Sequence, residues 1–215
     1  MIQIVFEDDY LIVVNKRANL LTVPTATRKY PTLTNQASEY LKTKNQKAFA
    51  CHRLDRQTSG LVIYAKRKDI QKDIMLQFKK RKIHKRYFAI VQGSIVEKSR
   101  VIRNTVCPRG KPARFAVTKF TVMHRSKDFS FLDIEPETGR TNQIRIHLCQ
   151  IGHPVIGERK YTVAKRWPVK FRRACLHAYS IEFQHPVSKD KVNIKIGLAP
   201  DIQNFLDNHH LEVRL

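Results

Sequence analysis

HRLDRQTSGLVIYAK, residues 52–66, places one acidic side chain, Asp55, between Arg53 and Arg56 and just ahead of Gly60. The second half of the stretch is apolar and rich in β-branched residues, which predicts a buried strand that begins at Gly60. We expect Asp55 to lie on a loop held rigidly against that strand. An ionised carboxylate there can act as a nucleophile or a base, but it can also be half of an ion pair or cap a turn. The residue types alone leave both interpretations open.

Charge is the unusual feature of the composition. The 215 residues include 41 Lys and Arg against 18 Asp and Glu, a formal net charge of +23, while the hydrophobic fraction of 42% is that of an ordinary folded protein. Such an excess of positive charge repels itself and favours a polyanionic partner. Nucleic acid is the first candidate, and an anionic membrane surface is the second.

Several classes of protein are disfavoured. The first residues have no basic segment of the kind that begins a signal peptide, and no run reaches the roughly 20 apolar residues of a spanning helix. The four cysteines lie far apart without a C-x-x-C pair, which favours thiols in a reducing compartment, so we expect a cytoplasmic protein. His147 and His153 lack further ligands at metal spacing, and nucleotide-binding glycine loops and a G-x-S-x-G elbow are missing, so we expect neither metal nor cofactor. The acids Asp133, Glu135 and Glu137 fit a strand and its turn better than a glycosidase pair.

Hydrophobic periodicity predicts one α+β domain over residues 1–215, built on a mixed, largely antiparallel sheet with flanking helices. Thr141 is expected to cap one of these helices, which ends at Gly152. The expected strands cover residues 2–6, 10–16, 60–66, 86–93, 114–125, 129–139, 175–186 and 192–197, and the expected helices cover residues 33–44, 69–80, 142–152 and 200–208.

Basic side chains gather in three segments, at residues 79–86, 109–114 and 165–173. A single basic run is usually a solvated face, but three of them with this net charge favour a surface that follows phosphates. In the first segment we expect phosphate contacts from Lys79, Lys80, Arg81 and Lys82. Trp167 in the third segment can stack on an RNA base, or it can belong to the core.

The motifs of the chain resemble those of the RluA family of pseudouridine synthases. Residues 52–61 are similar to the family pattern H-R-L-D-x-x-T-S-G-[LV], and residues 85–93 to K-x-Y-x-A-x-V-x-G. Residues 138–161 resemble T-G-R-T-H-Q-I-R-x-H-…-G-H-P-[IV]-x-G-D-x-x-Y, and residues 173–178 resemble R-x-x-L-H-A. The opening hairpin is also similar, so the resemblance runs in order from residue 6 to about 186.

The resemblance implies roles for particular residues. Asp55 would be the nucleophile that attacks the target uridine, so that the base detaches, rotates and rejoins through carbon. Tyr87 would pack against the flipped base and assist proton removal, and Arg145 would pair with Asp55 and orient it. Leu176 would form part of the apolar wall, and Arg53 would fill the gap that the uridine leaves in the RNA stack.

Four more residues are expected to bind substrate under the same resemblance: Arg56, Thr58, Arg140 and Gln143. The implied activity is isomerisation of a specific uridine in a stem-loop of transfer or ribosomal RNA, without a metal or another cofactor. We expect a monomer, with no S4-type RNA-binding domain beside the catalytic domain.

Three positions depart from the family pattern. Asn142 stands where the family usually has His, Arg17 where it has Pro, and Glu158 where it has Asp. We expect none of the three to touch Asp55, Tyr87, Arg145 or Leu176.

Two other functions stay open as alternatives. The first is a catalytically inactive RNA-binding or ribosome-assembly factor on the same scaffold. The second is a base-excising glycosidase or nuclease, which would need an activated water and therefore a second carboxylate or a metal site.

Overall fold

The computed structural model describes residues 2–24, 31–162 and 167–211. This part of the chain holds ten strands and four helices, which confirms the predicted α+β class. It divides into two compact units, unit 1 with residues 1–84 and 178–215 and unit 2 with residues 85–177. The chain crosses from one unit to the other within β5 (His84–Gln92) and within β9 (Leu176–Gln184). That residues 1–215 act as one catalytic domain stays a prediction.

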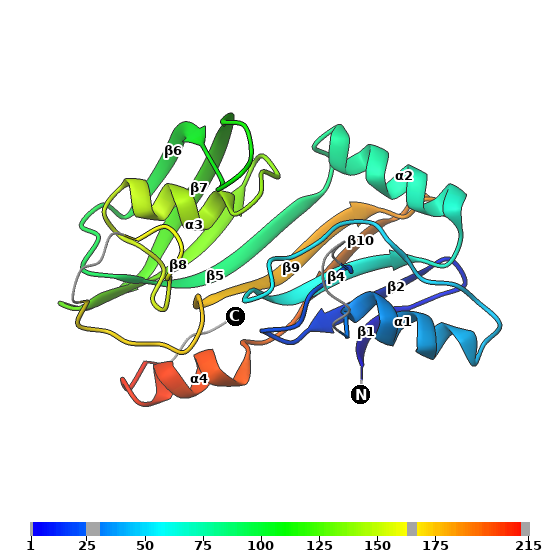
Figure 1. Ribbon diagram of the computed structural model, residues 1–215, viewed down its shortest axis with the longest axis horizontal. Coiled ribbons are helices and arrows are strands. Elements are labelled where there is room, and N and C mark those ends of the chain that lie inside the picture. Colours follow the sequence, from blue (N-terminus) through cyan, green and yellow to red (C-terminus); the bar gives the residue numbers. More distant parts are fainter. Residues whose placement is uncertain (1, 25–30, 163–166, 212–215) are drawn as a thin grey trace. The chain divides into compact units, whose positions relative to one another are not determined.

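Unit 1 is a sheet with helices (Figure 1). Its strands follow the order β1–β2–β4–β9, with β3 paired to β4 and β10 paired to β9. The pairs β1–β2, β2–β4, β3–β4 and β9–β10 are all antiparallel. Besides β9, the elements are β1 (Gln3–Glu7), β2 (Leu11–Lys16), β3 (Phe49–Ala50), β4 (Ser59–Ala65), β10 (Lys191–Lys195), α1 (Leu33–Lys42), α2 (Lys68–Lys79) and α4 (Pro200–Asp207).

Local side-chain chemistry explains where the first elements turn and begin. The side chain of Asp8 accepts hydrogen bonds from the backbone N–H of Tyr10 (2.8 Å) and Leu11 (2.7 Å), which forms the predicted hairpin turn. Thr32 caps α1, because its hydroxyl accepts from the N–H of Asn35 while the Asn35 side chain accepts from the N–H of Thr32. The helix ends at Lys42, two residues before the predicted end.

The core of unit 1 forms around β4, whose seven residues are all buried. The predicted apolar face of α2 packs on this strand through Ile70 and Ile74. Strands β2, β9 and β10 contribute further buried members of the cluster: Leu11, Val13, Ile181, Phe183 and Ile194. The strand that follows Asp55 is therefore the centre of a core, as the apolar run predicts.

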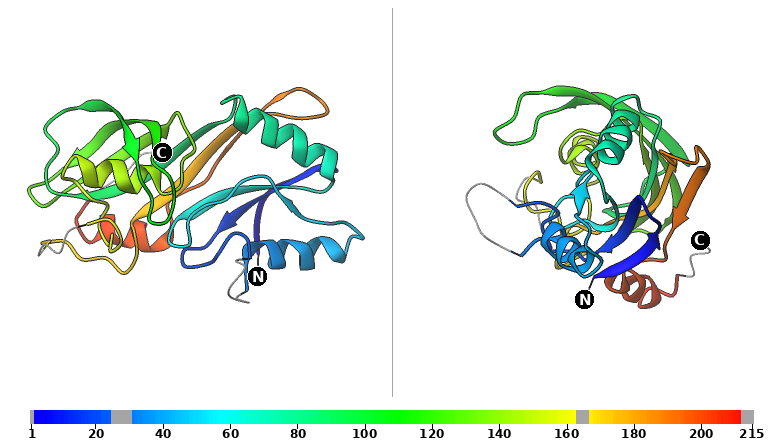
Figure 2. Two further views of the ribbon diagram at one scale, coloured as in Figure 1. Left: turned by 45° about the horizontal axis from the view of Figure 1, so that its top comes forward. Right: turned by 90° about the vertical axis from the view of Figure 1, so that its right-hand side faces the viewer.

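Unit 2 is an antiparallel sheet in the order β5–β8–β7–β6. Its elements besides β5 are β6 (Ser99–Val106), β7 (Arg114–Arg125), β8 (Phe129–Pro136) and α3 (Gln143–Gln150). Figures 1 and 2 show α3 lying across the β6–β7 hairpin, where Ile146 packs on Val106 and Ala116.

Unit 2 departs from prediction at two places. The strand β6 was not predicted, because only Ile102 and Val106 of its eight residues are buried and its pattern of polar side chains does not alternate. Thr141 does not cap α3; the N-cap is Asn142, in a left-handed conformation with φ of 54° and without a side-chain cap hydrogen bond. The end of α3 agrees with prediction, since Gly152 follows it with φ of 84° and donates to the carbonyl of Cys149.

Candidate active site

In unit 1 the loop that carries Asp55 is held to the core on both sides. On the N-terminal side the ring of His52 accepts a hydrogen bond from the N–H of Ile63 (3.1 Å), and the hydroxyl of Thr22 bonds to both the N–H and the carbonyl of Leu54 (3.1 and 2.9 Å). On the C-terminal side the N–H of Thr58 donates to the carbonyl of Asp55 (3.1 Å). Asp55 therefore lies, as expected, on a loop that hydrogen bonds at His52 and Leu54 tie to the core, and the rigidity of that loop stays a prediction.

Lys16 adds a buried positive charge beneath the same loop. Its ammonium group donates to the carbonyls of Arg17 (3.1 Å), Leu20 (2.8 Å) and Arg56 (3.2 Å), and the residue is fully buried. One side chain therefore joins the end of β2 to the residue that follows Asp55. Sequence reasoning missed both Lys16 and Thr22, because hydrogen bonds to backbone carbonyls leave no pattern in the sequence.

Gly60 explains why this loop must end in a glycine. Its φ is 116°, and a Cβ atom at this position would stand 2.2 Å from the carbonyl oxygen of Ala178 in β9. Both the backbone conformation and the close approach of the neighbouring strand exclude a larger residue.

The four predicted site residues on this loop differ in exposure. Asp55 is half-buried, Arg53 and Arg56 are exposed, and Thr58 is buried. The side chain of Arg56 donates to the carbonyl of Asn19 (3.2 Å). The buried hydroxyl of Thr58 has no hydrogen-bond partner among the described residues.

In unit 2, Tyr87 and Leu176 are both buried, with 6% and 3% of their surfaces exposed. Tyr87 lies on β5 opposite Ile134 of β8. Leu176 begins β9, and its carbonyl accepts a hydrogen bond from Arg173 (3.1 Å), which also bonds to the carbonyl of Ala174 (3.0 Å). Arg173 is 1% exposed, so its place in the basic segment 165–173 reflects a structural role and not a surface charge.

Arg145 is held by the carboxylate of Glu158. Two guanidinium nitrogens donate to the two carboxylate oxygens, at 2.5 Å from Nε and 2.8 Å from Nη2, and both side chains are buried. The carboxylate also accepts from the N–H groups of Lys160 (2.7 Å) and Tyr161 (3.3 Å). Burial alone would raise the pKa of Glu158, but the hydrogen bonds and charge of Arg145, with the two backbone donors, hold that pKa below its usual value.

Glu158, one of the three residues that depart from the family pattern, contacts Arg145 directly, so the expectation that none of them touches a pocket residue is wrong for Glu158. Asn142 is linked to Arg145 through Tyr161. Its side-chain oxygen accepts from the hydroxyl of Tyr161 (2.6 Å), and the ring of Tyr161 lies 5.5 Å from the guanidinium carbon of Arg145. A comparison with the family pattern shows that residues 142 and 158 differ, but it does not show which side chains they contact.

Arg140 lies on the loop that precedes α3, and Gln143 is the first residue of that helix. The side-chain oxygen of Gln143 accepts from the hydroxyl of Thr138 and the N–H of Arg140, and its nitrogen donates to Thr118 and to the carbonyl of Val117. The bonds of Gln143 fix the loop before α3, a role that the sequence pattern assigns to a Thr141 cap. Substrate binding by Gln143 stays a prediction, since its amide already has four partners within unit 2.

His147, on the same helix, is fully buried and has both ring nitrogens in hydrogen bonds. One pairs with the hydroxyl of Thr118 (2.9 Å) and the other with the carbonyl of Asn104 (3.3 Å). Burial lowers its pKa, so the ring is neutral and structural.

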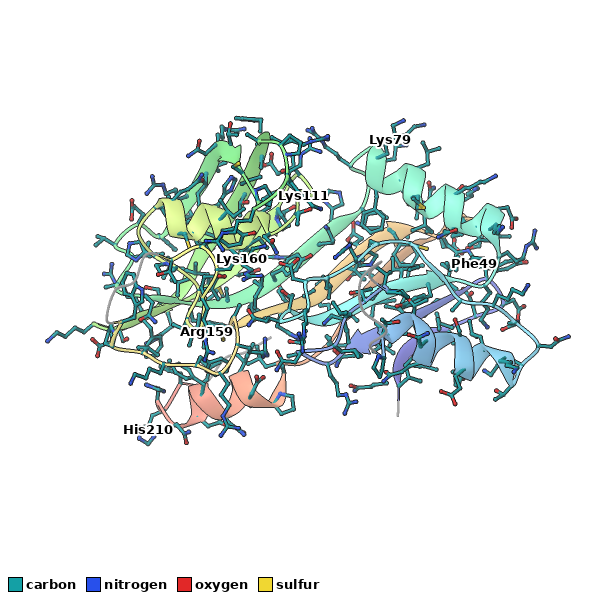
Figure 3. All side chains as sticks on the ribbon, in the orientation of Figure 1. Phe49, Lys79, Lys111, Arg159, Lys160 and His210 are labelled. Atoms are coloured by element: carbon teal, nitrogen blue, oxygen red, sulfur yellow. The ribbon has the colours of Figure 1, made fainter. Side chains whose placement is uncertain are left out.

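The basic segments differ in how much of them reaches the surface. Lys79, Lys80, Arg81 and Lys82 are all exposed, and Figure 3 shows Lys79 at the C-terminal end of α2. In the third segment Lys165 and Arg166 lie outside the described residues. Trp167 is half-buried and donates to the hydroxyl of Thr162 (3.1 Å), so the choice between base stacking and core packing stays open.

Comparison with known proteins identifies the family. A family model described as RNA pseudouridylate synthase matches residues 10–150. This chain belongs to that family. The RluA resemblance of its motifs is thereby confirmed, and the synthase is an isomerase that acts on RNA uridine.

Two curated relatives and one solved structure show how far the similarity reaches. The synthase is 30% identical to Ribosomal large subunit pseudouridine synthase D of Haemophilus ducreyi, over 96% of this chain and 70% of that one. It is 32% identical to Dual-specificity RNA pseudouridine synthase RluA of Pasteurella multocida, over 88% of this chain and 90% of that one. Its fold is similar to that of Human RNA Pseudouridylate Synthase Domain Containing 4, with a TM-score of 0.83 at 22% identity, over 98% of this chain and 94% of that one.

In the part of the chain that the structure describes, none of the helices is both long and apolar enough to span a bilayer.

Proposed function

We propose that the synthase uses Asp55 as the nucleophile that converts one uridine of a structured RNA to pseudouridine. Attack of the Asp55 carboxylate on the ribose forms an ester bond there and breaks the bond from ribose to the base nitrogen. The base rotates, its carbon bonds to the same ribose atom as the ester bond breaks and frees Asp55, the proton on that carbon leaves, and the freed base nitrogen takes up a proton. No atom is gained or lost overall. The observation that supports this role is the loop itself, which holds the half-buried carboxylate of Asp55 between the anchored residues Leu54 and Thr58.

The other site residues have proposed roles that fit their observed surroundings. Tyr87 and Leu176 are buried, with a ring and an apolar side chain of the kind that suits contact with a flipped base. Arg145, held by Glu158, is proposed to orient Asp55. Arg53 is exposed on the same loop as Asp55, so its planar guanidinium can enter the RNA stack where the uridine was.

We propose that the target uridine lies in a stem-loop of transfer or ribosomal RNA. The names of the relatives support this range, since one refers to the large ribosomal subunit and the other to dual specificity. Arg56, Thr58, Arg140 and Gln143 are proposed to help bind this RNA. The synthase is further proposed to act as a monomer in the cytoplasm, with residues 1–215 as one catalytic domain.

The test of the nucleophile is Asp55→Asn, which keeps the size of the side chain and removes its charge. RNA is incubated with each variant, and pseudouridine is detected by carbodiimide labelling. We expect activity below about 1% of wild type with unchanged RNA binding, because no other group can form the covalent bond. Residual activity of several per cent would exclude Asp55 as the nucleophile.

Tyr87→Phe is the companion variant, since it keeps the ring and removes only the hydroxyl. We expect normal RNA binding and a stall after attack, visible in single-turnover kinetics. If the wild-type chain binds RNA but forms no pseudouridine on total cellular RNA, the alternative of an inactive RNA-binding factor is correct instead.

A further inference from the structure

A small pocket in unit 2 lies where two basic stretches of the chain meet. One is the connection from β6 to β7, and the other is the loop of residues 139–141 that precedes α3. The pocket has a volume of about 250 Å³, below the roughly 300–1,000 Å³ of pockets that hold drug-sized ligands. It therefore suits a single chemical group more than a whole nucleotide.

The side chains that line this pocket carry charge of one sign. They include Lys111, Arg114 and Arg140, together with the hydroxyl of Thr141, and no carboxylate is among the described lining residues. Three cations in one concave site repel one another and raise the local positive potential, which an anion relieves. Arginine and lysine with a hydroxyl are the donors that bind phosphate oxygens.

Hydrogen bonds hold the two walls in place before a ligand arrives. The ammonium group of Lys111 donates to the hydroxyl of Thr141 (3.3 Å), which ties the two stretches together across 30 residues of sequence. The N–H of Lys111 donates to the carbonyl of Pro108 (3.0 Å) and closes a turn; Figure 3 labels Lys111. The side chain of Arg140 donates through Nε to the carbonyl of Phe115 (3.4 Å), and its two terminal nitrogens make no hydrogen bond to the described residues.

We propose that this pocket binds one phosphate group of the RNA backbone. The proposal rests on the proposed function for its ligand, since an RNA substrate supplies the phosphate. It is separate from the basic cluster at the end of α2, which belongs to unit 1. The pocket would fix the register of the RNA strand without reading its sequence.

The salt dependence of RNA binding tests the proposal, because it counts neutralised phosphates. For a single strand, the slope of log affinity against log salt changes by about 0.7 for each phosphate contact. The probe is a short fluorescent oligouridylate, which suffices because this electrostatic contribution does not depend on sequence. The variants are Arg140→Gln alone and the triple variant Lys111→Gln, Arg114→Gln, Arg140→Gln.

One phosphate shared by three cations predicts a particular pattern. Arg140→Gln should weaken binding about tenfold with little change of slope, since the two remaining cations still neutralise the phosphate. The triple variant should flatten the slope by about 0.7 in total. A slope that flattens by about 0.7 in the single variant and by about 2.1 in the triple variant would show an open basic face with three phosphates. An unchanged slope in the triple variant would show that RNA does not reach the pocket. Either result overturns the proposal.

The control uses two exposed lysines of the same unit, Lys98 and Lys127. Neither lines the pocket, and the register of β6 with β7 places them at the opposite end of this hairpin. Lys98→Gln, Lys127→Gln should leave both affinity and slope as in wild type. RNA binding can be measured without turnover, so the two proposals can fail separately. If the wild-type chain makes no pseudouridine but its variants give the expected slopes, the proposed activity is wrong and the phosphate pocket is supported.

Discussion

At the scale of single residues, the contact between Glu158 and Arg145 makes a departure from the family pattern testable. Glu158→Gln keeps the shape of the side chain but removes the charge from a buried pair. We expect kcat to fall by about 10- to 100-fold, because a hydrogen bond to a charged group contributes about 1.5–3 kcal/mol. KM for RNA should stay close to wild type, since the carboxylate of Glu158 is fully buried and cannot reach the substrate.

The matched variant is Glu158→Asp, which restores the residue that the family usually has. It keeps the charge and shortens the side chain by one methylene group, so we expect it to recover most of the lost kcat. Breaking a buried ion pair can lower the free energy of unfolding by roughly 3–5 kcal/mol. Thermal unfolding of both variants therefore separates an effect on kcat from a loss of folded protein. A rise of KM without a fall of kcat would contradict the positioning role.

The sequence proposes several site residues but does not show their surroundings. Asp55 stands out because a lone acid between two arginines precedes an apolar strand. Glu158 stands out only as a deviation, because its partner Arg145 is 13 residues away on α3 and no sequence pattern links the helix to the loop after it. The role of Lys16 was invisible, because a lysine that binds three carbonyls looks the same in sequence as a lysine in water.

At the scale of elements, amphipathic helices and alternating strands were predictable, and the exceptions have local causes. The start of α3 was misplaced because the side chain of Gln143, and not a Thr141 hydroxyl, satisfies the loop. The strand β6 was missed because most of its side chains are exposed on both faces. In both cases the local sequence pattern does not show which side chain makes the deciding contact or which face is buried.

The C-terminal end of α2 carries the prediction for the first basic segment. Replacing Lys79, Lys80 and Lys82 with Gln should weaken binding of all RNAs about equally and flatten the salt slope by about 0.7 for each phosphate contact that is lost. Arg81, whose backbone is left-handed with φ of 56°, is left intact so that the variant changes lysines alone. The control is Lys42→Gln, Lys47→Gln, two exposed lysines of unit 1 outside the basic segments. Unchanged affinity and slope would show that the end of α2 does not face RNA.

The carboxylate of Glu7 joins three elements and predicts a pH dependence of stability. It accepts hydrogen bonds from Tyr40 in α1 (2.7 Å), from Lys44 just after α1 (2.7 Å) and from Lys66 just after β4 (2.8 Å). Burial alone would raise the pKa of Glu7, but these three donors lower it from 4.5 to about 2. Since the folded pKa lies below the unfolded one, the stabilisation is complete above pH 4.5 and is lost as the pH falls towards 2.

Glu7→Gln should therefore lower the free energy of unfolding at pH 7 by about 1 kcal/mol. The difference from wild type should shrink as the pH falls through that window, which urea unfolding at several pH values measures. Asp9→Asn, an exposed acid in the same hairpin, is the control and should show no such convergence. A difference that is the same at every pH would mean that Glu7 acts through packing and not through its charge.

At the scale of the whole molecule, the net charge of +23 acts on any RNA, while selection of one uridine needs a specific shape. Both units contribute basic surface: the end of α2 in unit 1 and the phosphate pocket in unit 2. Surfaces of this kind set how strongly RNA binds and how salt weakens it. They do not by themselves choose the target.

Selection is therefore expected to come from a loop whose bases can splay out without breaking a duplex, since sequence-specific RNA recognition favours such loops. By analogy with protein–DNA interfaces, a protein of this size covers about 1,000–2,500 Å² of nucleic acid, enough for a hairpin but not for an extended ribosomal fold. A short stem-loop with the target uridine should then be modified nearly as well as the full RNA. The target is first mapped by carbodiimide labelling of RNA from cells that lack this gene, and kcat/KM is then compared for stem-loop and intact transcript. A loss beyond roughly a hundredfold, about 2.7 kcal/mol of transition-state stabilisation, would mean that contacts outside the stem-loop carry the recognition.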